Sequence, residues 1–411
     1  MRILFVHNRY RQPGGEDVVV QAESALLERM GHEIEIWQES NASIVGIADA
    51  CKTGLDCAYS FHHAREARER IQRFHPDVVH VHNFFPRISP SIHMACHRAG
   101  VPVVQTLHNF RLLCPKATLY RSGGVCEDCC GRAVPWPGVL HRCYRENSAA
   151  TLAVAGMLSV HRALGTWGRC VSRYVALNEF ARSKFIAGGL PAERIVVKPN
   201  FVDPDPEVGS GDGEFALFVG RLTEEKGIGV LLSAWRLLAE KPKLRIIGDG
   251  PLAALVADAA ASDTSIAWLG ARGRDEVRQS MREATALIVP STWYEGFPLV
   301  ITEAFAAGLP VIASRLGAME ELVEDGVTGR LFAAGDPHRL ASAVRWIFWH
   351  PEERKAMRLQ ARAEYEHKYT AAANYARMLA IYEDALKCFP AQARLSRTPA
   401  SGAHAIGQTL P

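Results

Sequence analysis

The sequence has no apolar run long enough to cross a membrane. The longest run after the N-terminus, residues 152–160, is far shorter than the roughly 20 residues that a membrane-spanning helix requires. The apolar residues 1–7 meet Asn8 and Arg9 at once and are too few for the core of a signal peptide, so we expect a first strand there. These absences predict a cytoplasmic protein.

Densely basic segments are also absent, although the net charge is +3. Residues 1–200 carry 24 Lys and Arg against 17 Asp and Glu, a balance of +7, and the rest carry 23 against 27, a balance of −4. Within residues 87–184 the count is 13 basic against 4 acidic. The surplus favours peripheral contact with the anionic inner face of a membrane, or it is an ordinary solvated surface. We expect no nucleic acid partner.

Strand-like apolar runs alternate with helical patterns along the 411 residues, which is a length for about two or three domains. Because the runs are apolar throughout, they suit parallel strands buried on both faces. The order predicts an α/β protein of two doubly wound, Rossmann-like domains. Strands are expected at residues 3–7, 33–37, 78–82, 101–106, 173–177, 215–220, 244–248, 265–269, 286–289 and 311–313, with the first helix at about 17–30.

A segment rich in proline, glycine and acids, residues 198–213, predicts a linker between domains 1–200 and 201–370. Apolar residues then recur at helical spacing within 371–388, which predicts one more amphipathic helix. These residues are Tyr375, Met378, Leu379, Tyr382 and Leu386. The small, polar residues 389–411 are expected to form a disordered tail.

Two cations follow the expected strand at residues 215–220. Arg221 comes directly after this strand, and Lys226 lies at the start of the next helix. In open α/β sheets, ligands bind at the carboxyl ends of the strands. Arginine offers a planar fork of donors and lysine a compact charge, so the pair can neutralise a diphosphate leaving group without a metal. The alternative is a solvated loop.

Two glutamates, Glu295 and Glu303, enclose a short segment that follows the expected strand at residues 286–289. Gly296 is expected to free the backbone, and Pro298 to pre-set the first turn of a helix that runs to about residue 307. The free amides from Gly296 to Val300, among them those of Phe297 and Leu299, suit an anion. The carboxylates instead suit sugar hydroxyls. The alternative is a solvated helix face that carries two acids.

Residues 220–227 and 295–303 together resemble the signature of the retaining glycosyltransferases of family 4, and the likeness extends over most of residues 1–388. The resemblance implies the GT-B fold, in which two domains face each other across a cleft and the last helix returns to the first domain. It implies that Arg221 and Lys226 hold the donor diphosphate, that Glu303 holds the ribose and that Glu295 holds the donor sugar.

The resemblance also covers two expected turns in the second domain. Asp249 and Gly250 lie in a turn similar to the one beside the nucleotide, and Trp268 and Leu269 lie in a segment similar to the one that reads the base. Tight turns without any ligand contact are the alternative for both.

Two features of the first domain belong to the same resemblance. Gly14 and Gly15, in the loop of residues 12–16, permit close approach of a donor phosphate, unless the loop is an ordinary surface turn. His108 follows a strand-like run and corresponds to a histidine near the reacting carbon, where it would bind the donor sugar or steady charge. The alternative for His108 is a purely structural role, and a structural role is what we expect for His80 and His82.

The ten cysteines include a cluster with the spacing C-x11-C-x2-C. The members are Cys114, Cys126 and Cys129, and Cys143 follows within a Cys-rich insert of about residues 114–143. This spacing is compatible with a structural zinc knuckle, with free thiols, or with a redox or catalytic role. A cytosolic location disfavours disulfides.

The sequence holds one Asp-x-Asp pair, Asp203 and Asp205, of the kind that binds a divalent ion in metal-dependent sugar transferases of another fold. Because it lies in the linker, we interpret it as linker and expect no cofactor for catalysis. The sequence therefore predicts transfer of a sugar from a nucleotide-diphosphate sugar to a lipid-linked, polysaccharide or other glycan acceptor with retention of configuration. The alternatives are an inactive nucleotide-sugar-binding scaffold of this fold, or a related phosphorylase or epimerase.

Overall fold

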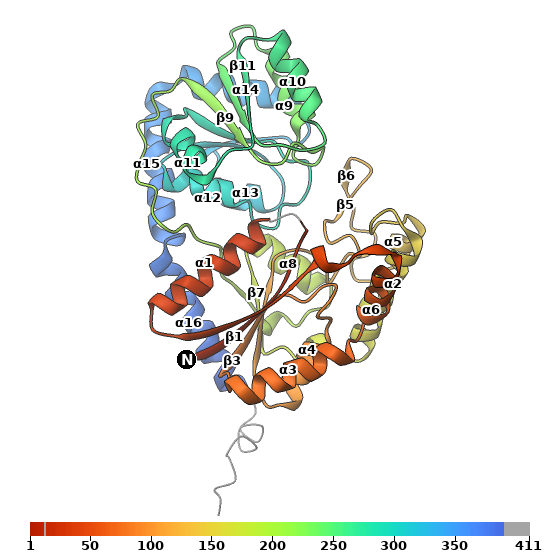
Figure 1. Ribbon diagram of the computed structural model, residues 1–411. Helices are drawn as coiled ribbons and strands as arrows, with labels where there is room; N and C mark the ends of the chain where they lie inside the picture. Colours follow the sequence, from red (N-terminus) through yellow and green to blue (C-terminus); the bar gives the residue numbers. More distant parts are fainter. Residues whose placement is uncertain (12–13, 390–411) are drawn as a thin grey trace, which may run out of the picture.

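The computed structural model describes residues 1–11 and 14–389, which form two lobes, each built around a parallel sheet (Figure 1). The strands of the first sheet are β1 (Arg2–Arg9), β2 (Glu33–Ser40), β3 (Val78–Asn83), β4 (Val103–Leu107), β7 (Arg173–Ala176) and β8 (Ile195–Val197). Those of the second are β9 (Phe215–Val219), β10 (Lys243–Ile247), β11 (Ile266–Gly270), β12 (Ala286–Val289), β13 (Val311–Ser314) and β14 (Gly329–Phe332). A small antiparallel hairpin, β5 (Tyr120–Arg121) and β6 (Gly124–Val125), lies outside both sheets.

The spatial order is β2-β1-β3-β4-β7-β8 in the first sheet and β11-β10-β9-β12-β13-β14 in the second. All pairs within the two sheets are parallel, so the predicted α/β class with two Rossmann-like domains is confirmed. Strands β8 and β14 were not predicted. Both are short edge strands: β8 has only the three apolar residues Ile195–Val197, and β14 includes Arg330, so neither shows a long apolar run.

Helices connect the strands and cover both faces of each sheet. They are α1 (Gly15–Arg29), α2 (Gly46–Asp56), α3 (Phe61–Phe74), α4 (Ser91–Arg98), α5 (Trp136–Leu140), α6 (Ser148–Ala163), α7 (Thr166–Arg169), α8 (Glu179–Ala187), α9 (Ile228–Leu237), α10 (Ala253–Ser262), α11 (Arg274–Glu283), α12 (Leu299–Ala306), α13 (Ala318–Leu322), α14 (Pro337–Trp349), α15 (Pro351–Lys368) and α16 (Ala371–Cys388). Among the described helices, none combines the length and apolarity needed to span a membrane.

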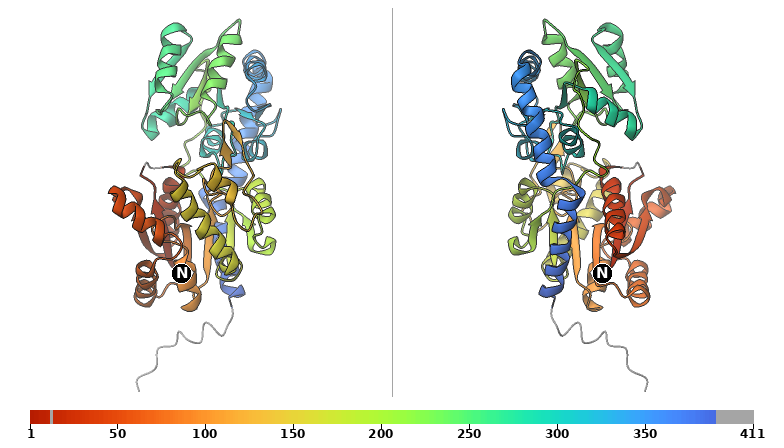
Figure 2. Two further views of the ribbon diagram at one scale, coloured as in Figure 1. Left: turned by 90° about the vertical axis from the view of Figure 1, so that its right-hand side faces the viewer. Right: turned by 90° about the vertical axis from the view of Figure 1, so that its left-hand side faces the viewer.

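The last helix crosses from the second lobe to the first, as predicted (Figure 2). Helix α15 packs against α12 in the second lobe, whereas Met378 and Tyr382 of α16 join a buried cluster with Ile3 and Phe5 of β1. Phe389, which the sequence analysis assigned to the tail, is buried and its ring lies 6.2 Å from that of His97. The remainder of the expected tail, residues 390–411, lies outside the described residues.

The strand order shows where the crevice of each sheet lies, because the crevice forms where the order of the strands reverses. In the second sheet the chain builds β10 and β11 on one side of β9 and then β12 on the other, so the loops after β9 and β12 diverge at a switch point. The first sheet has its switch point between β1 and β3. The two sets of loops meet, because a Cβ added at Gly15, after β1, would lie 3.3 Å from Leu299, after β12.

Candidate functional site

Two loops of the second lobe pack directly on each other and define the candidate site. We call residues 220–227, after β9, the cation loop and residues 290–298, after β12, the glutamate loop. The Thr292 amide donates to the Glu225 carbonyl over 2.9 Å. Gly227 has φ +74°, and a Cβ there would lie 1.9 Å from the Pro290 carbonyl oxygen, so only glycine permits this approach.

The packing of these loops brings Lys226 against Glu295. The Lys226 Nζ lies 2.7 Å from Glu295 Oε1, and the Ser291 hydroxyl donates to the same oxygen over 2.7 Å. Glu295 is buried, which alone would raise its pKa, but the charge and hydrogen bond of Lys226 hold the pKa below its usual value. The structure therefore places an ionised carboxylate and an ammonium group together at the sheet's crevice.

Arg221 extends from the first position of the cation loop and keeps 62% of its side chain exposed. The nearest recorded carboxylate is that of Glu225, at 4.0 Å, which is a weak contact for an exposed pair. Its guanidinium thus stays largely exposed to solvent.

Gly296 contacts the first lobe and explains how the two lobes meet at the site. A Cβ added there would lie 2.6 Å from the His108 carbonyl oxygen, and the Asn178 side chain donates to the Gly296 carbonyl over 2.7 Å. The expectation that Gly296 frees the backbone needs correction, because its φ is not in the left-handed region. A side chain at position 296 would clash with the backbone of the first lobe, so glycine is required there.

Helix α12 begins directly after Pro298, and no side chain within residues 1–11 and 14–389 caps its N-terminus. Phe297 packs with the core of the second lobe, and Leu299 faces Gly15 of the first lobe. The predicted boundaries of this helix, 298–307, agree with the observed Leu299–Ala306 within one residue at each end.

Glu303 lies one turn further along α12, in a cavity of about 220 Å³ between the lobes. Val18 and Val19 of α1 line one side, and Arg274 and Arg278 of α11 line the other. Burial raises the pKa of Glu303, and the positive charges of the two arginines oppose this increase. The two glutamates of the motif therefore lie in different surroundings, one ion-paired and the other in an open cavity.

The turn after β10 packs against the cation loop. Gly248 and Gly250 have φ of +145° and +157°, and a Cβ at Gly248 would lie 1.9 Å from the Gly220 carbonyl oxygen. Asp249 is exposed at the tip, and its carbonyl accepts from the Leu222 amide over 2.9 Å. The Trp268 indole donates to the Gly248 carbonyl over 3.0 Å, and Leu269 packs against the core. These contacts support the loop geometry without assigning any ligand.

His108 ends a chain of buried histidines that crosses the first sheet. Its Nε2 lies 3.0 Å from His82 Nδ1, and burial, reinforced by the charges of His7 and Lys198, lowers the pKa of His108 to about 3. His80 hydrogen-bonds to Tyr382 of α16 and to Thr106, each over 2.8 Å. His108 is thus a neutral imidazole, and the chain links it to the last helix.

Glu16 is a candidate that the sequence analysis named only as part of the glycine-rich loop. Burial raises the pKa of Glu16 to about 8, the charge of Asp17 adds to this, and hydrogen bonds from Tyr10 and Asn109 oppose it. Asn109 directly follows His108, so Glu16 lies close to the predicted reaction site. A carboxylate immediately after Gly14 and Gly15 was the available signal. Gln12 and Pro13 of this loop lie outside the described residues.

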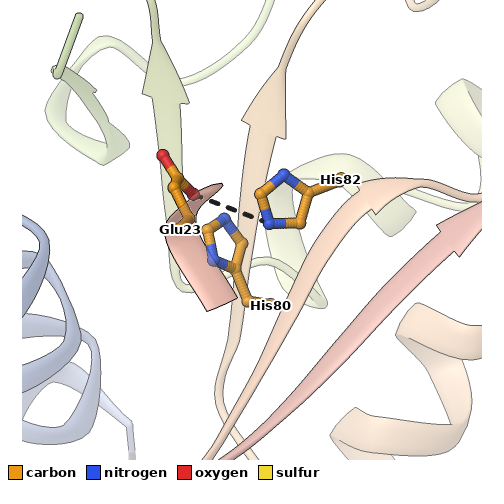
Figure 3. A group of neighbouring side chains, drawn as sticks. All are labelled: Glu23, His80 and His82. Atoms are coloured by element: carbon orange, nitrogen blue, oxygen red, sulfur yellow. Dashed lines mark ion pairs between the residues drawn. The ribbon is translucent and has the colours of Figure 1, made fainter. Parts of the chain in front are cut away.

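Among the described residues, two groups bring three ligand atoms within 4.8 Å of one another. In Glu23–His80–His82, Glu23 already pairs with Lys198 over 2.6 Å and both nitrogens of His80 are bonded (Figure 3). We therefore interpret this group as a hydrogen-bonded network.

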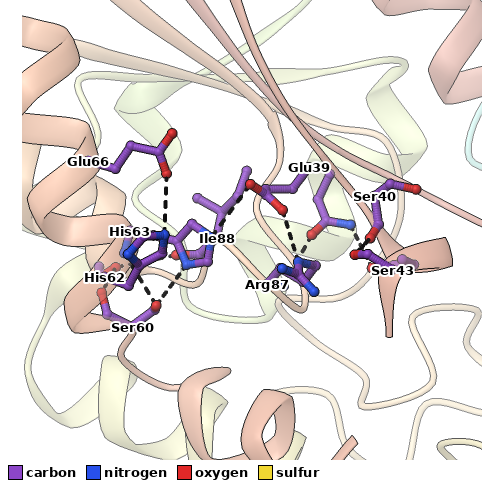
Figure 4. A network of polar contacts seen from close by, with 12 residues as sticks. Glu39, Ser40, Ser43, Ser60, His62, His63, Glu66, Arg87 and Ile88 are labelled. Atoms are coloured by element: carbon purple, nitrogen blue, oxygen red, sulfur yellow. Dashed lines mark hydrogen bonds and ion pairs between the residues drawn. The ribbon is translucent and has the colours of Figure 1, made fainter. Parts of the chain in front are cut away.

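The second group, His62–His63–Glu66, lies on α3 and belongs to a network of polar contacts (Figure 4). Ser60 bonds His63 Nδ1 over 2.7 Å, and the other nitrogen of His63 faces Glu39 at 3.8 Å. Since His62 is 73% exposed, the group is also better explained as a polar network. The four predicted cysteine ligands belong to neither group, but they line a single cavity.

Comparisons with known proteins agree with this architecture. A family model described as Glycosyltransferase Family 4 matches residues 13–206, and one described as Glycosyl transferases group 1 matches residues 214–348. The chain is 31% identical to the amylovoran biosynthesis glycosyltransferase AmsK of Erwinia amylovora over 49% of its own length and 53% of that protein. It is 33% identical to an uncharacterized glycosyltransferase of Methanocaldococcus jannaschii over 46% of its length and 56% of that protein. It thus spans about half of these two relatives.

A longer match, at 26% identity, covers 90% of this chain and 90% of the phosphatidyl-myo-inositol mannosyltransferase of Mycolicibacterium smegmatis. Among solved structures, the HepE protein of Anabaena in complex with UDP-glucose aligns with a TM-score of 0.64 at 19% identity, over 92% of this chain and 99% of that one. Sucrose-phosphate synthase from Thermosynechococcus elongatus aligns with a TM-score of 0.69 at 15% identity, over 93% and 98%. At these identities the structures establish the fold alone. The chain belongs to family 4 of the glycosyltransferases, and its two facing lobes have the GT-B fold.

Proposed function

We propose that the protein transfers a hexosyl group from a nucleotide-diphosphate sugar to a glycan or lipid-linked acceptor and retains the anomeric configuration. One observation carries the proposal. The Lys226–Glu295 pair lies next to Gly296, and Gly296 abuts the backbone of His108 in the opposite lobe. The cation and carboxylate thus lie at the point where the backbone of His108 meets the second lobe.

The donor would occupy this junction in a defined direction. Arg221 and Lys226, helped by the first amides of α12, would bind the diphosphate, and Glu295 would accept hydrogen bonds from the sugar. Glu303, deeper along α12, would accept from the ribose hydroxyls. Lys226 has three N–H donors, so it can keep its bond to Glu295 and still bind a phosphate oxygen.

The relatives support a nucleotide-sugar donor without fixing its identity. HepE has been crystallised with UDP and with UDP-glucose. Other relatives are named as a phosphatidyl-myo-inositol mannosyltransferase and as a glycosyltransferase of amylovoran biosynthesis. A lipid-linked or polysaccharide acceptor, and so a role in building the cell envelope, is the reading that fits both names.

The structure offers a face for such an acceptor on the first lobe. Helix α2 has no buried residue, and Ile47 and Leu55 are 84% and 82% exposed. Between α2 and α6 lies a mostly apolar cavity of about 700 Å³, with Arg145 in its wall. We propose that the lipid part of an anionic, membrane-bound acceptor occupies this cavity, because the basic surplus of the first half complements its charge.

The proposed mechanism needs no nucleophile from the protein. The cations would stabilise the departing diphosphate, and the acceptor would attack from the face that the diphosphate leaves. His108 is uncharged at neutral pH and would orient the donor sugar or stabilise charge by a hydrogen bond. Contact between the lobes at Gly296 would exclude water and so limit hydrolysis of the donor.

A panel of nucleotide sugars, offered with and without a lipid extract as acceptor pool, tests the proposal. We expect acceptor-dependent release of a nucleoside diphosphate. Arg221→Ala should reduce this turnover by about 100-fold, the scale for loss of one electrostatic stabiliser. Arg236→Ala, which removes an exposed arginine of α9, is the matched control.

Donor binding without diphosphate release under any of these conditions would favour the inactive scaffold. Conversion of the donor sugar without an acceptor would favour an epimerase. Near-normal turnover of Arg221→Ala would remove that residue from the proposed leaving-group site.

A further inference from the structure

The Cys-rich insert folds around one small cavity. Four of the ten cysteines line it, together with Pro115, Lys116, Tyr120, Arg121 and Gly138. The cavity has a volume of about 10 Å³, which is close to the space that a single water-sized or ion-sized sphere requires. The four cysteines are Cys114, Cys126, Cys129 and Cys143.

The four cysteines reach the cavity from three separate turns. The Cys114 amide closes a turn onto the Phe110 carbonyl over 2.9 Å, and the Cys143 amide bonds the Gly138 carbonyl over 3.0 Å, directly after α5. Cys126 and Cys129 follow the β5–β6 hairpin, and the Cys126 amide bonds the Leu119 carbonyl over 2.8 Å. Loops that share no regular element thus bring their cysteines to one cavity.

The surroundings favour a metal over unassociated thiols. All four cysteines are free, and Cys114 and Cys129 are buried. A zinc ion bound by four thiolates carries a net charge of −2, and the cations Lys116 and Arg121 stand in the wall of the same cavity. Arg121 also pairs with Asp128 over 2.8 Å, which leaves Lys116 as the main counter-charge for the thiolates.

We propose that these four cysteines bind one structural Zn²⁺ ion. Binding converts four thiols into thiolates and releases four protons, with no change in oxidation state. In the described part of the chain, no three of these sulfur atoms lie within 4.8 Å of one another. Binding of the ion would therefore draw the sulfur atoms closer together. Tetrahedral Zn–S bonds of about 2.3 Å require S–S separations of about 3.8 Å.

The ion would also fix a contact between the lobes. The β5–β6 hairpin reaches up beside the second lobe (Figure 1), where a Cβ at Gly123 would lie 3.3 Å from Glu224 Oε1 of the cation loop. In the same insert, Glu127 pairs with Lys184 of α8 over 2.6 Å. The consequence for donor binding rests on the proposed function, whereas the metal site does not.

The metal content of the full-length protein, purified without added metal, tests the site directly. We expect about one zinc per chain, and its loss in Cys126→Ser and Cys129→Ser. Cys130→Ser is the matched control, because Cys130 adjoins Cys129 but is not part of the cavity wall. Zinc retained in both cysteine variants would overturn the assignment of ligands.

Because a ligand variant can fail to fold, the unmodified protein provides a second test. Replacing zinc by Co²⁺ should give the thiolate-to-cobalt absorption of a tetrahedral site, and the metal should protect four thiols from a thiol reagent. A folded, metal-free protein with all four thiols reactive, or one with a disulfide among them, would contradict the proposal. Both measurements are made without donor, so their outcome is independent of the sugar-transfer activity.

Discussion

At the scale of single residues, the two glutamates of one motif differ in protonation chemistry. Glu295 is held ionised by Lys226 at 2.7 Å. Glu303 has no ion pair within 4.0 Å among the described residues, and burial raises its pKa. The first carboxylate thus stays an acceptor to a lower pH than a free glutamate would, whereas the second begins to lose its acceptor strength at a higher pH.

Glu303→Ala should raise the donor KM by about 10- to 100-fold, because hydrogen bonds to a charged group contribute roughly 1.5–3 kcal/mol. In the unmodified enzyme, KM should increase on acidification while the pH is still above 4.5, since a raised pKa means that protonation begins earlier. Steady-state kinetics over a pH series measures both effects.

Glu303→Gln and Asp275→Asn are the controls for this prediction. The glutamine cannot titrate, so its KM should not follow that pH dependence. Asp275 of α11 lies near the cavity but is 98% exposed, and its substitution should leave KM unchanged. A KM that is unaffected by Glu303→Ala would remove the ribose assignment.

The places of several site residues in the fold could be predicted from the sequence, but the reasons for some residue types could not. The positions of Arg221, Lys226 and Glu295 follow from their strands, because ligands bind at carboxyl ends of parallel strands. The proximity of Gly296 to His108 depends on how two distant parts of the chain meet, and no local pattern records it. For the same reason, the environment of Glu16 could not be foreseen.

At the scale of elements, strands β3 and β4 carry a set of buried neutral histidines. His80, His82 and His108 lie on or directly after them, and His93 of α4 packs alongside, with its Nε2 2.8 Å from Gln105. Burial lowers the pKa of His93 to about 4 and that of His108 to about 3. These side chains bind protons more readily in the unfolded chain, where the pKa is near 6.5.

The folded state should therefore lose stability as the pH falls below 6.5. The unfolded chain binds more protons between pH 6.5 and the folded pKa, so each such histidine lowers the free energy of unfolding by about 1.4 kcal/mol per pH unit. For His93 this loss extends to about pH 4. Urea titrations at a series of pH values measure the slope.

His93→Gln isolates one contribution, since the amide can still bond Gln105 but cannot bind a proton. The slope of stability against pH should decrease by about 1.4 kcal/mol per pH unit in this variant. An unchanged slope would mean that His93 does not contribute to acid unfolding.

The sequence predicted the central strands and the edge strands β2 and β11, but not the short edge strands β8 and β14. The strand β12 was predicted with its observed bounds, because four consecutive apolar residues are buried on both faces. In β14, Arg330 and Leu331 are only half-buried, so the sequence has no uniform apolar run. Edge strands depend on a neighbour that local sequence does not specify.

At the scale of the whole molecule, the apolar cavity between α2 and α6 lies on the first lobe, whereas the cation and glutamate loops lie on the second. Helices α2, α5 and α6 lie on the same side of the first lobe as the β5–β6 hairpin in Figure 1. The hairpin contacts the cation loop of the second lobe. A lipid bound between α2 and α6 would therefore lie on the same side of the first lobe as this contact. Orientation of the enzyme on a membrane would then decide how an acceptor enters.

Binding to lipid vesicles should consequently depend on α2 and on anionic lipid. Burying an Ile or Leu side chain contributes about 1.5–3 kcal/mol, so Ile47→Asp or Leu55→Asp should reduce the partition coefficient by at least about 10-fold. Leu359→Asp alters an exposed leucine (68%) of α15 in the second lobe and should have no effect. Cosedimentation with phosphatidylcholine vesicles, with and without phosphatidylglycerol, measures this partition. Equal loss of binding in all three variants would indicate non-specific adsorption. If the unmodified protein bound neither kind of vesicle, a membrane contact by α2 would be excluded, because its exposed apolar side chains would not enter the bilayer.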